Sequence, residues 1–246
     1  MERDYTPVSS DSEWKNGCCS LAVKIYSSGA ASQWLRTLQA GAQVLLSHPH
    51  MTLRVPSFAP EGAPGSLMRP SSVFLLVGGT GVAPAIQAIR MSTGDSFPLI
   101  CSYSCRQNDV LGRDMLVKVM EGRIKYITSI QDAYGQNMSS LVEKGAVLNF
   151  HVTPPNTDET PIFQLQSPLD GTIEAPHSLV GNSWEKPPWV KVSAGRVTQQ
   201  DVEISLGALK KPTRVVISGP AAFNSNLREL VCSCGVTPQW ITVLEA

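Results

Sequence analysis

A glycine-rich turn stands where a buried strand is expected to give way to a helix. Val73 to Val77 form a short apolar run typical of a fully buried parallel strand. Gly78-Gly79-Thr80-Gly81 permits a tight turn after it, and Pro84 suits the first turn of the helix that follows. The N–H groups and the dipole of such a helix favour an anion, and glycines let a pyrophosphate approach the backbone closely. The spacing therefore predicts a phosphate-binding turn, with a purely structural glycine turn as the alternative.

A second turn of the same kind lies near the carboxyl end of the chain. Ser218-Gly219-Pro220 follows a strand expected over 214–217 and precedes a helix with Phe223, Leu227 and Leu230 on one face. Ligands of open α/β sheets bind outside the carboxyl ends of the strands. The second turn is therefore also expected at the carboxyl edge of a sheet.

A third motif, Arg3-Asp4-Tyr5-Thr6-Pro7-Val8-Ser9, precedes both turns. Its Arg-x-Tyr-Thr-Pro pattern resembles the FAD signature of the ferredoxin-NADP reductase superfamily, and Gly-Gly-Thr-Gly-x-x-Pro resembles the pyridine-nucleotide loop of that superfamily. Residues 23–26 and 29–35 resemble the next two FAD segments. The subgroup that the chain most resembles is NADH-cytochrome b5 reductase.

The resemblance implies FAD, together with NADH or NADPH, as cofactors. Arg3 would pair with the FAD pyrophosphate, because a guanidinium matches phosphate oxygens in a bidentate way. Tyr5 and Thr6 would line the isoalloxazine, Ser32 and the amides of its helix would contact the pyrophosphate, and the nicotinamide would lie at Ser218. The catalytic candidates are Tyr5, Thr6 and Ser218. The other cofactor-binding candidates are Asp4, Lys24, Tyr26, Gly29, Ala31, Gly78, Gly79, Thr80, Gly81, Ala83, Arg106, Gly219 and Pro220.

The chain departs from the family pattern at several of these positions. Cytochrome b5 reductases carry Cys-Gly-Pro where this chain has Ser218, and a threonine where it has Ala83; the usual terminal aromatic is missing after Leu244. Since the hydride chemistry belongs to the cofactors, the serine is expected to slow transfer without forbidding it. Arg106 stands where the family distinguishes its nucleotides, and either meets a 2′-phosphate of NADPH or is a solvated loop charge.

The hydrophobic pattern divides the chain into two parts at a Pro/Gly/Ser-rich linker, residues 56–72. Residues 1–68 are expected to form a partial antiparallel FAD-binding barrel, with strands over 20–26 and 42–47 and a short helix over 32–38 capped by Ser32. Residues 69–246 alternate strands with helices, which predicts a doubly wound parallel-sheet nucleotide-binding domain of α/β class. The expected strands are 73–77, 98–102, about 147–152, 214–218 and 239–244, and the expected helices are about 82–92, 109–120, 198–206 with Thr198 as N-cap, and 221–232.

Two stretches do not fit a complete version of this architecture. The first sixty residues offer about three strands, too few for a closed barrel, and Met1 stands immediately before the FAD motif. We therefore expect either a truncated chain or a degenerate relative whose open edge is covered by something else. Residues 153–193 show no clear element and are interpreted as a surface insertion, in which Trp184 and Trp189 are either anchors onto the domain or a partner contact.

The composition argues against a nucleic-acid-binding protein, a metalloprotein and a membrane-spanning protein. The 246 residues include 20 basic and 20 acidic side chains, and with no basic run a nucleic-acid partner is not expected. The 6 cysteines lack zinc-site spacing and are interpreted as reduced thiols, so no metal is expected. Neither a signal or transit peptide nor an apolar run long enough to span a bilayer is visible, which predicts an intracellular chain with at most peripheral membrane association.

The sequence therefore predicts an FAD-dependent oxidoreductase that passes a hydride from NAD(P)H to flavin and electrons onward to a haem-protein acceptor. The alternative is a catalytically degenerate nucleotide-binding assembly factor or an inactive truncated fragment. Ser-Gly-Pro also occurs in fungal mitochondrial relatives that act in cytochrome c maturation. That resemblance implies a mitochondrial location, with the cytoplasm or the face of the endoplasmic reticulum as the other choices.

Overall fold

The computed structural model describes residues 4–47, 53, 57–59, 68–95, 97–107, 110–129, 142, 147–154, 165–166, 173–174 and 185–245. Arg3 and Trp184, two residues with expected roles, lie outside these ranges, as does the carboxyl-terminal Ala246. The site and its surroundings are derived from the described residues.

A six-stranded parallel sheet forms the centre of the molecule, with strand order β6-β3-β2-β1-β7-β8. Its strands are β1 (Ser72–Gly78), β2 (Leu99–Arg106), β3 (Leu148–Thr153), β6 (Val190–Ala194), β7 (Thr213–Gly219) and β8 (Ile241–Glu245). Two short strands, β4 (Leu165–Gln166) and β5 (Ile173–Glu174), pair only with each other. The central strands β1 and β7 are buried along their whole length, as the apolar runs predicted.

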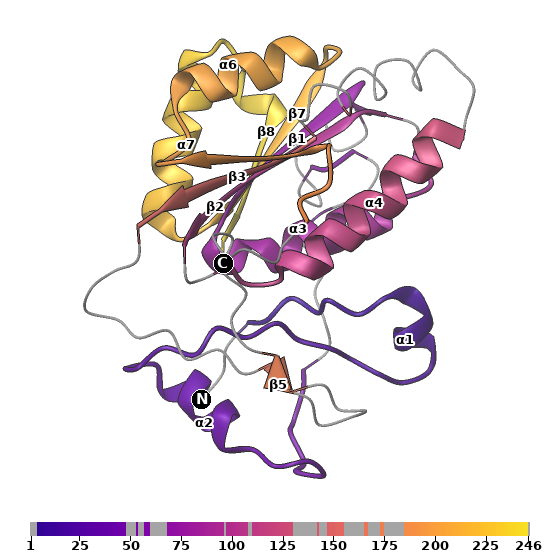
Figure 1. The fold of residues 1–246 in the computed structure, drawn as a ribbon, viewed down its shortest axis with the longest axis vertical. Coiled ribbons are helices and arrows are strands. Elements are labelled where there is room, and N and C mark those ends of the chain that lie inside the picture. The colour runs from indigo at the N-terminus through magenta and orange to yellow at the C-terminus, as the bar shows by residue number, and fades with distance from the viewer. Residues whose placement is uncertain are drawn as a thin grey trace.

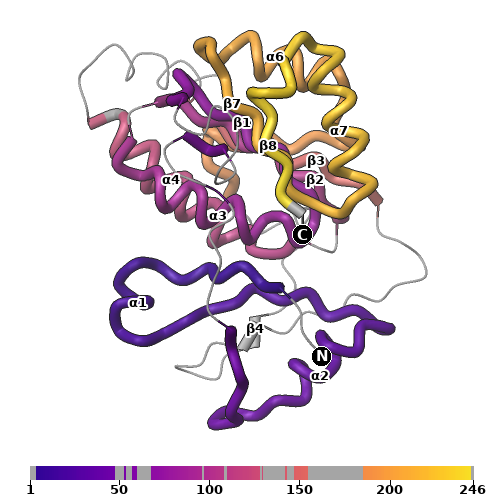
Figure 2. Tube along the Cα trace, turned by 180° about the vertical axis from the view of Figure 1, so that it is seen from behind, coloured from indigo at the N-terminus to yellow at the C-terminus, as the bar shows by residue number. Residues whose placement is uncertain are grey.

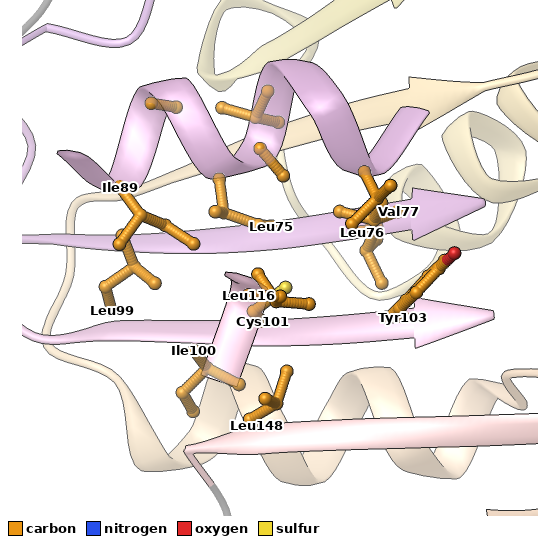
Figure 3. Close-up of a cluster of buried hydrophobic side chains, with 14 of the residues drawn as sticks. Leu75, Leu76, Val77, Ile89, Leu99, Ile100, Cys101, Tyr103, Leu116 and Leu148 are labelled. Carbon is orange, nitrogen blue, oxygen red and sulfur yellow. The ribbon is translucent and has the colours of Figure 1, made fainter. Parts of the chain in front are cut away.

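Helices cover both faces of this sheet (Figure 1). The helices α3 (Val82–Met91) and α4 (Arg113–Ser129) lie on one face, and α6 (Gln199–Ala208) and α7 (Ala221–Ser233) lie on the other. Figure 3 shows the core between β1, β2 and α3, where Leu75, Leu99 and Ile89 pack together. The doubly wound α/β fold predicted from the alternation of strands and helices is confirmed.

The sheet contains one strand that the sequence analysis missed. Residues 190–193 were expected in an insertion without a clear element, but together with Ala194 they form β6, which pairs with β3 from Leu148↔Val190 to Val152↔Ala194. Within β6 only Val190 is buried, because the strand stands at the edge of the sheet. An edge strand with so little apolar character carries a weak sequence signal, and Trp189, also buried, was the better indication.

The N-terminal part contains two short helices, α1 (Asp11–Lys15) and α2 (Ala30–Thr37), joined by extended segments. The strands expected over 20–26 and 42–47 are not formed in the described residues, where the only pairing is the antiparallel bridge Pro7↔Leu21. Strands need a partner for their backbone groups, and residues 42–47 show no strand pairing with described residues. The side chain of Leu45 is fully exposed. The expectation that Ser32 caps α2 was wrong, because the helix begins two residues earlier and Gly29 is the N-cap.

The N-terminal part packs against the sheet domain at several points. The Gln87 side chain of α3 donates to the Ser9 carbonyl at 2.9 Å, and the Thr242 hydroxyl of β8 donates to the Phe58 carbonyl at 2.6 Å. Both Val8 and Phe58 are buried. In Figures 1 and 2, the end of the sheet at which β8 finishes, formed by the carboxyl ends of the strands, faces the N-terminal part. Since all six strands are parallel, this is the edge at which both glycine turns lie.

Thr198 caps α6 as the sequence predicted. Its hydroxyl accepts the Asp201 N–H at 3.2 Å, and the Asp201 carboxylate accepts the Thr198 N–H at 2.9 Å, a reciprocal capping box. We expect Thr198→Ala to lower the free energy of unfolding by about 1 kcal/mol, the usual contribution of an N-cap. Urea denaturation would measure this. Thr237→Ala is the matched control, because Thr237 precedes a short helix without making a side-chain cap, and equal losses for both variants would contradict the assignment.

The imidazole of His151 is buried on β3 beneath α6, with 3% of the residue exposed. Burial lowers the pKa of His151 from its ordinary value and Lys191 adds to this, while Asp201 opposes it. The folded chain therefore binds a proton at this imidazole less readily than the unfolded chain does. Stability should fall as the pH is lowered through the unfolded pKa of about 6.5 toward the lower folded pKa.

This pH dependence is measurable as a difference between two proteins. Urea midpoints of the unchanged chain should decrease between about pH 7 and pH 5, and those of His151→Gln should decrease less. The Asp201 carboxyl titrates outside this window, because its own pKa is lowered by hydrogen bonds from Thr198 despite desolvation. Parallel pH profiles of the two proteins would show that His151 does not titrate differently on folding.

Candidate functional site

The two glycine turns meet at the point where the strand order of the sheet reverses. From β1 the chain proceeds through β2 and β3 to β6 on one side, then returns to β7 and β8 on the other side of β1. Val77 of β1 pairs directly with Ser218 of β7. Crevices at such switch points are the general ligand sites of open parallel sheets, so the topology places both predicted turns in one candidate site.

Gly81 lies so close to the second turn that no side chain would fit there. A Cβ on Gly81 would lie 2.7 Å from the Gly219 amide nitrogen and closer still to the Ser218 carbonyl oxygen. A Cβ on Gly219 would lie 2.6 Å from Cδ1 of Phe223, the ring of which also packs against Gly78. Direct backbone contact therefore joins the two turns, and the Phe223 ring covers them on one side.

Tyr103 supports the first turn from below, a role that the sequence analysis missed. Tyr103 lies on β2 directly beside Val77 of β1 and is fully buried. Its hydroxyl donates to the Leu111 carbonyl at 3.1 Å and lies 3.3 Å from the Gly79 carbonyl. Figure 3 shows the hydroxyl at the end of the strand. A buried tyrosine needs a hydrogen-bond partner for its hydroxyl. The position of Tyr103 near the end of an apolar strand could therefore have indicated a contact with the adjacent turn.

The helix that starts at the first turn has no side-chain cap from a described residue. A 3-10 turn over Gly79–Gly81 leads into α3. Thr80 is half-buried, and Ala83 is buried. α7, which starts after Pro220, likewise has no side-chain cap. Uncapped helix N-termini suit an anion, so pyrophosphate binding at this turn stays a prediction with which the geometry is compatible.

The FAD-binding candidates of residues 24–32 lie together in one local turn. Ser32 accepts the Tyr26 N–H at 3.1 Å and donates to the Gly29 carbonyl at 3.0 Å, and a Cβ on Gly29 would lie 2.6 Å from the Ser32 hydroxyl. The Lys24 ammonium lies 5.1 Å from the centroid of the Tyr26 ring. Ala31 follows in the first turn of α2, which has no side-chain cap. The Ser32 hydroxyl thus shapes the turn over 26–32, where Lys24 offers a positive charge.

The other predicted site residues are placed individually. Asp4 and Tyr5 are exposed and Thr6 is half-buried, in an extended segment. Arg106 is half-buried at the end of β2, the carboxyl edge at which the turns lie. No described contact joins Tyr5 or Thr6 to Ser218, so the predicted catalytic set remains a prediction.

Ser218 is buried, with 2% of the residue exposed, and its hydroxyl makes no hydrogen bond to a described residue. It faces Pro84 of α3 and Leu244 of β8 across a small space. A buried hydroxyl without a partner costs free energy, so Ser218→Ala should leave stability unchanged or raise it by up to about 1 kcal/mol. Thermal or urea unfolding of the chain without added cofactor would measure this.

Ser72 gives the opposite expectation and serves as the comparison for Ser218. Its hydroxyl, also buried, donates to the Lys210 carbonyl at 2.7 Å and lies 2.8 Å from that of Thr213. Ser72→Ala should therefore lower stability by about 1–2 kcal/mol. Similar losses for the two variants would show that the Ser218 hydroxyl has a partner after all.

Within the described ranges, His, Cys, Asp and Glu side chains form no group of three that would hold a metal ion. The six cysteines form no disulfide, and burial raises the pKa of the Cys101 thiol to about 12, which keeps it protonated. None of the described helices has the length and apolar character that a bilayer crossing requires.

Comparison with known proteins shows which flavoproteins this chain resembles. Residues 1–55 match the model of the oxidoreductase FAD-binding domain. NADH-cytochrome b5 reductase 2 of Danio rerio is 27% identical over 179 residues, which are 63% of this chain and 57% of that protein. The chain is thus similar to cytochrome b5 reductases of the ferredoxin-NADP reductase superfamily. The resemblance inferred from the Arg-x-Tyr-Thr-Pro and glycine motifs is thereby confirmed.

Solved structures with low sequence identity share the fold of this chain. The CS–b5R domains of human Ncb5or in the NAD+ form align with a TM-score of 0.56 at 17% identity, covering 99% of this chain and 56% of that chain. The Amycolatopsis cytochrome P450 reductase GcoB aligns with a TM-score of 0.54 at 14% identity, covering 100% of this chain and 56% of that chain. This cytochrome b5 reductase-like chain thus spans little more than half the length of the proteins it matches.

Proposed function

We propose that the chain acts in an FAD-dependent reductase, in which NADH or NADPH reduces the flavin and the flavin passes electrons onward. The observation that carries this proposal is the meeting of two glycine turns at the switch point of the parallel sheet. The match of residues 1–55 to an FAD-binding domain supports it, because this part faces that edge of the sheet. When bound, the nicotinamide and the flavin supply the hydride and electron chemistry.

The residues of the chain would bind and orient these groups. The uncapped N-terminus of α3 would hold the pyrophosphate of the nicotinamide nucleotide, where Gly79 and Gly81 allow a close backbone approach. Tyr103 would keep that turn in place from below. Lys24 and the N-terminus of α2 would serve the FAD pyrophosphate together with Arg3, which lies outside the described residues. Arg106, at the same edge, would either contact a 2′-phosphate of NADPH or remain a solvated loop charge.

A haem protein is the proposed electron acceptor. The support is that the Danio rerio relative is named as an NADH-cytochrome b5 reductase, and a cytochrome b5 is a haem protein. A mitochondrial location stays part of this proposal, resting only on the resemblance of the Ser-Gly-Pro turn.

Two measurements on the purified chain test the reductase proposal. Its visible absorption spectrum should show bound flavin in about equal amount to protein. NADH or NADPH consumption should then depend on a haem acceptor such as cytochrome b5. A chain that takes up no added FAD and oxidises neither nucleotide would refute the proposal.

A second candidate is a nucleotide-binding assembly factor without turnover. It is favoured by the burial of the Ser218 hydroxyl and by the absence of strand pairing over 42–47 in the described residues. Under this proposal, NADH or NADPH would bind saturably, as seen by quenching of tryptophan fluorescence, but would not be oxidised with any haem acceptor. Oxidation at a rate that follows the flavin content would rule it out.

A further inference from the structure

A cavity of about 390 Å³ separates α6 from strands β2, β3 and β6. It lies on the sheet face that α6 and α7 cover (Figure 1), and the residues that line it do not include those of the two glycine turns. Small-molecule pockets usually measure about 300–1,000 Å³, so the cavity has the size of a ligand site. Nothing in the proposed reductase function uses it.

The floor of this cavity is polar although it is buried. Ser102 of β2 and Asn149 and His151 of β3 line it, and each of these residues is less than a tenth exposed. A sheet face that only packs against a helix is normally apolar, as the opposite face is around Leu75 and Val77. Packing beneath α6 therefore does not explain these three polar side chains.

His151 has unused hydrogen-bonding capacity in this cavity. Both imidazole nitrogens are buried, and neither makes a hydrogen bond to a described residue. The carboxylate oxygen Oδ2 of Asp201 lies 3.9 Å from Nδ1, beyond hydrogen-bond distance. A neutral imidazole offers one donor and one acceptor, so a bound group with both capacities would satisfy it.

The other walls define the charge and polarity of the ligand. Asp201 and Lys191 carry opposite charges that balance, and burial keeps His151 neutral near pH 7, as its lowered pKa indicates. Ile100, Ile204 and Ala208 form an apolar wall. Lys191 and Ile204 are also exposed, which opens the cavity to solvent beside the edge strand β6. A net charge on the ligand would have no partner here and would be costly to bury.

We propose that this cavity binds a neutral amphipathic small molecule. Its apolar ring lies along Ile100, Ile204 and Ala208, and a single group that both donates and accepts a hydrogen bond lies at His151. Aromatic amides have this chemistry. The site is separate from the proposed nicotinamide site and does not depend on flavin binding.

Benzamide is the probe for the first test, on the full 246-residue chain. Imidazole proton resonances are followed by NMR during the titration, and the resonance of His151 is assigned by its loss in His151→Gln. We expect a saturable shift of this resonance that persists in the presence of saturating NADH. No saturable shift up to the solubility limit of benzamide, or a shift that NADH abolishes, would overturn the proposal.

Two variants locate the bound probe, with affinity measured from the benzamide signals. Ser205→Leu places an apolar side chain from α6 into the cavity and should weaken binding about tenfold, whereas Gln200→Leu, an exposed position on the same helix, should not. Far-UV circular dichroism checks folding, and Ala208→Leu is the second obstructing variant if Ser205→Leu does not fold. Unchanged affinity in a folded obstructing variant, or equally tight binding of the benzoate anion, would contradict the proposal.

Discussion

Gly81→Ala should lower the free energy of unfolding by about 3 kcal/mol. The new methyl group would clash with backbone atoms, and no side chain could move aside to make room for it. The atoms that it would meet belong to the backbone of Ser218, which pairs with β1, and of Gly219, which pairs with β8. Accommodating the methyl group would force the two turns apart. Urea denaturation of the variant and the unchanged chain measures the loss.

Gly94→Ala is the matched control for this prediction. Gly94 is an exposed glycine after α3, and a Cβ there would meet no atom within 4 Å. Its stability should therefore stay within about 0.5 kcal/mol of the unchanged chain. If Gly81→Ala were as stable as Gly94→Ala, the two turns would not be in contact. Under the proposed function, Gly81→Ala should also weaken NADH binding, which fluorescence quenching would show.

Arg123→Met should also lower the free energy of unfolding by about 3 kcal/mol. The guanidinium is fully buried and donates to two main-chain carbonyls, Ser92 O at the end of α3 and Phe97 O before β2, the second at 2.7 Å. It also lies 4.7 Å from the centroid of the Phe97 ring. Methionine keeps part of the volume but leaves both carbonyls buried without this donor. Each unsatisfied carbonyl would lower the free energy of unfolding by about 1–3 kcal/mol.

The charge of Arg123 persists in the interior. Burial lowers the pKa of Arg123 to about 10, while Asp95 opposes that shift, so the side chain stays protonated near neutral pH. Lys118→Met is the control, since Lys118 is an exposed cation on the same helix. Thermal or urea unfolding should show a much smaller change for Lys118→Met. Equal changes would mean that the two carbonyls find other donors.

Local patterns in the sequence were sufficient for much of the fold. Residues 73–77 were recognisable as a buried strand because five consecutive apolar residues precede a glycine turn, and Thr198 was recognisable as an N-cap from its place before a helical pattern. These signals arise from the backbone preferences and side-chain spacing of a few neighbouring residues. They failed where a strand depends on a distant partner, as β6 does on β3, and as residues 20–26 and 42–47 would on partners that the described residues lack.

The sequence by itself determined the resemblance to flavin reductases and the two glycine turns, because each has a signature in a short local segment, and it determined the parallel doubly wound fold through the alternation of strands and helices over residues 69–246. Only the tertiary structure decided that Gly81 touches the Ser218 carbonyl, that Tyr103 supports the first turn, that Arg123 is buried, and that His151 lines a polar cavity. Gly81 and Ser218 lie far apart in the chain. Their contact follows from the order and register of strands in the sheet and from the packing of helices onto it, which no local pattern encodes.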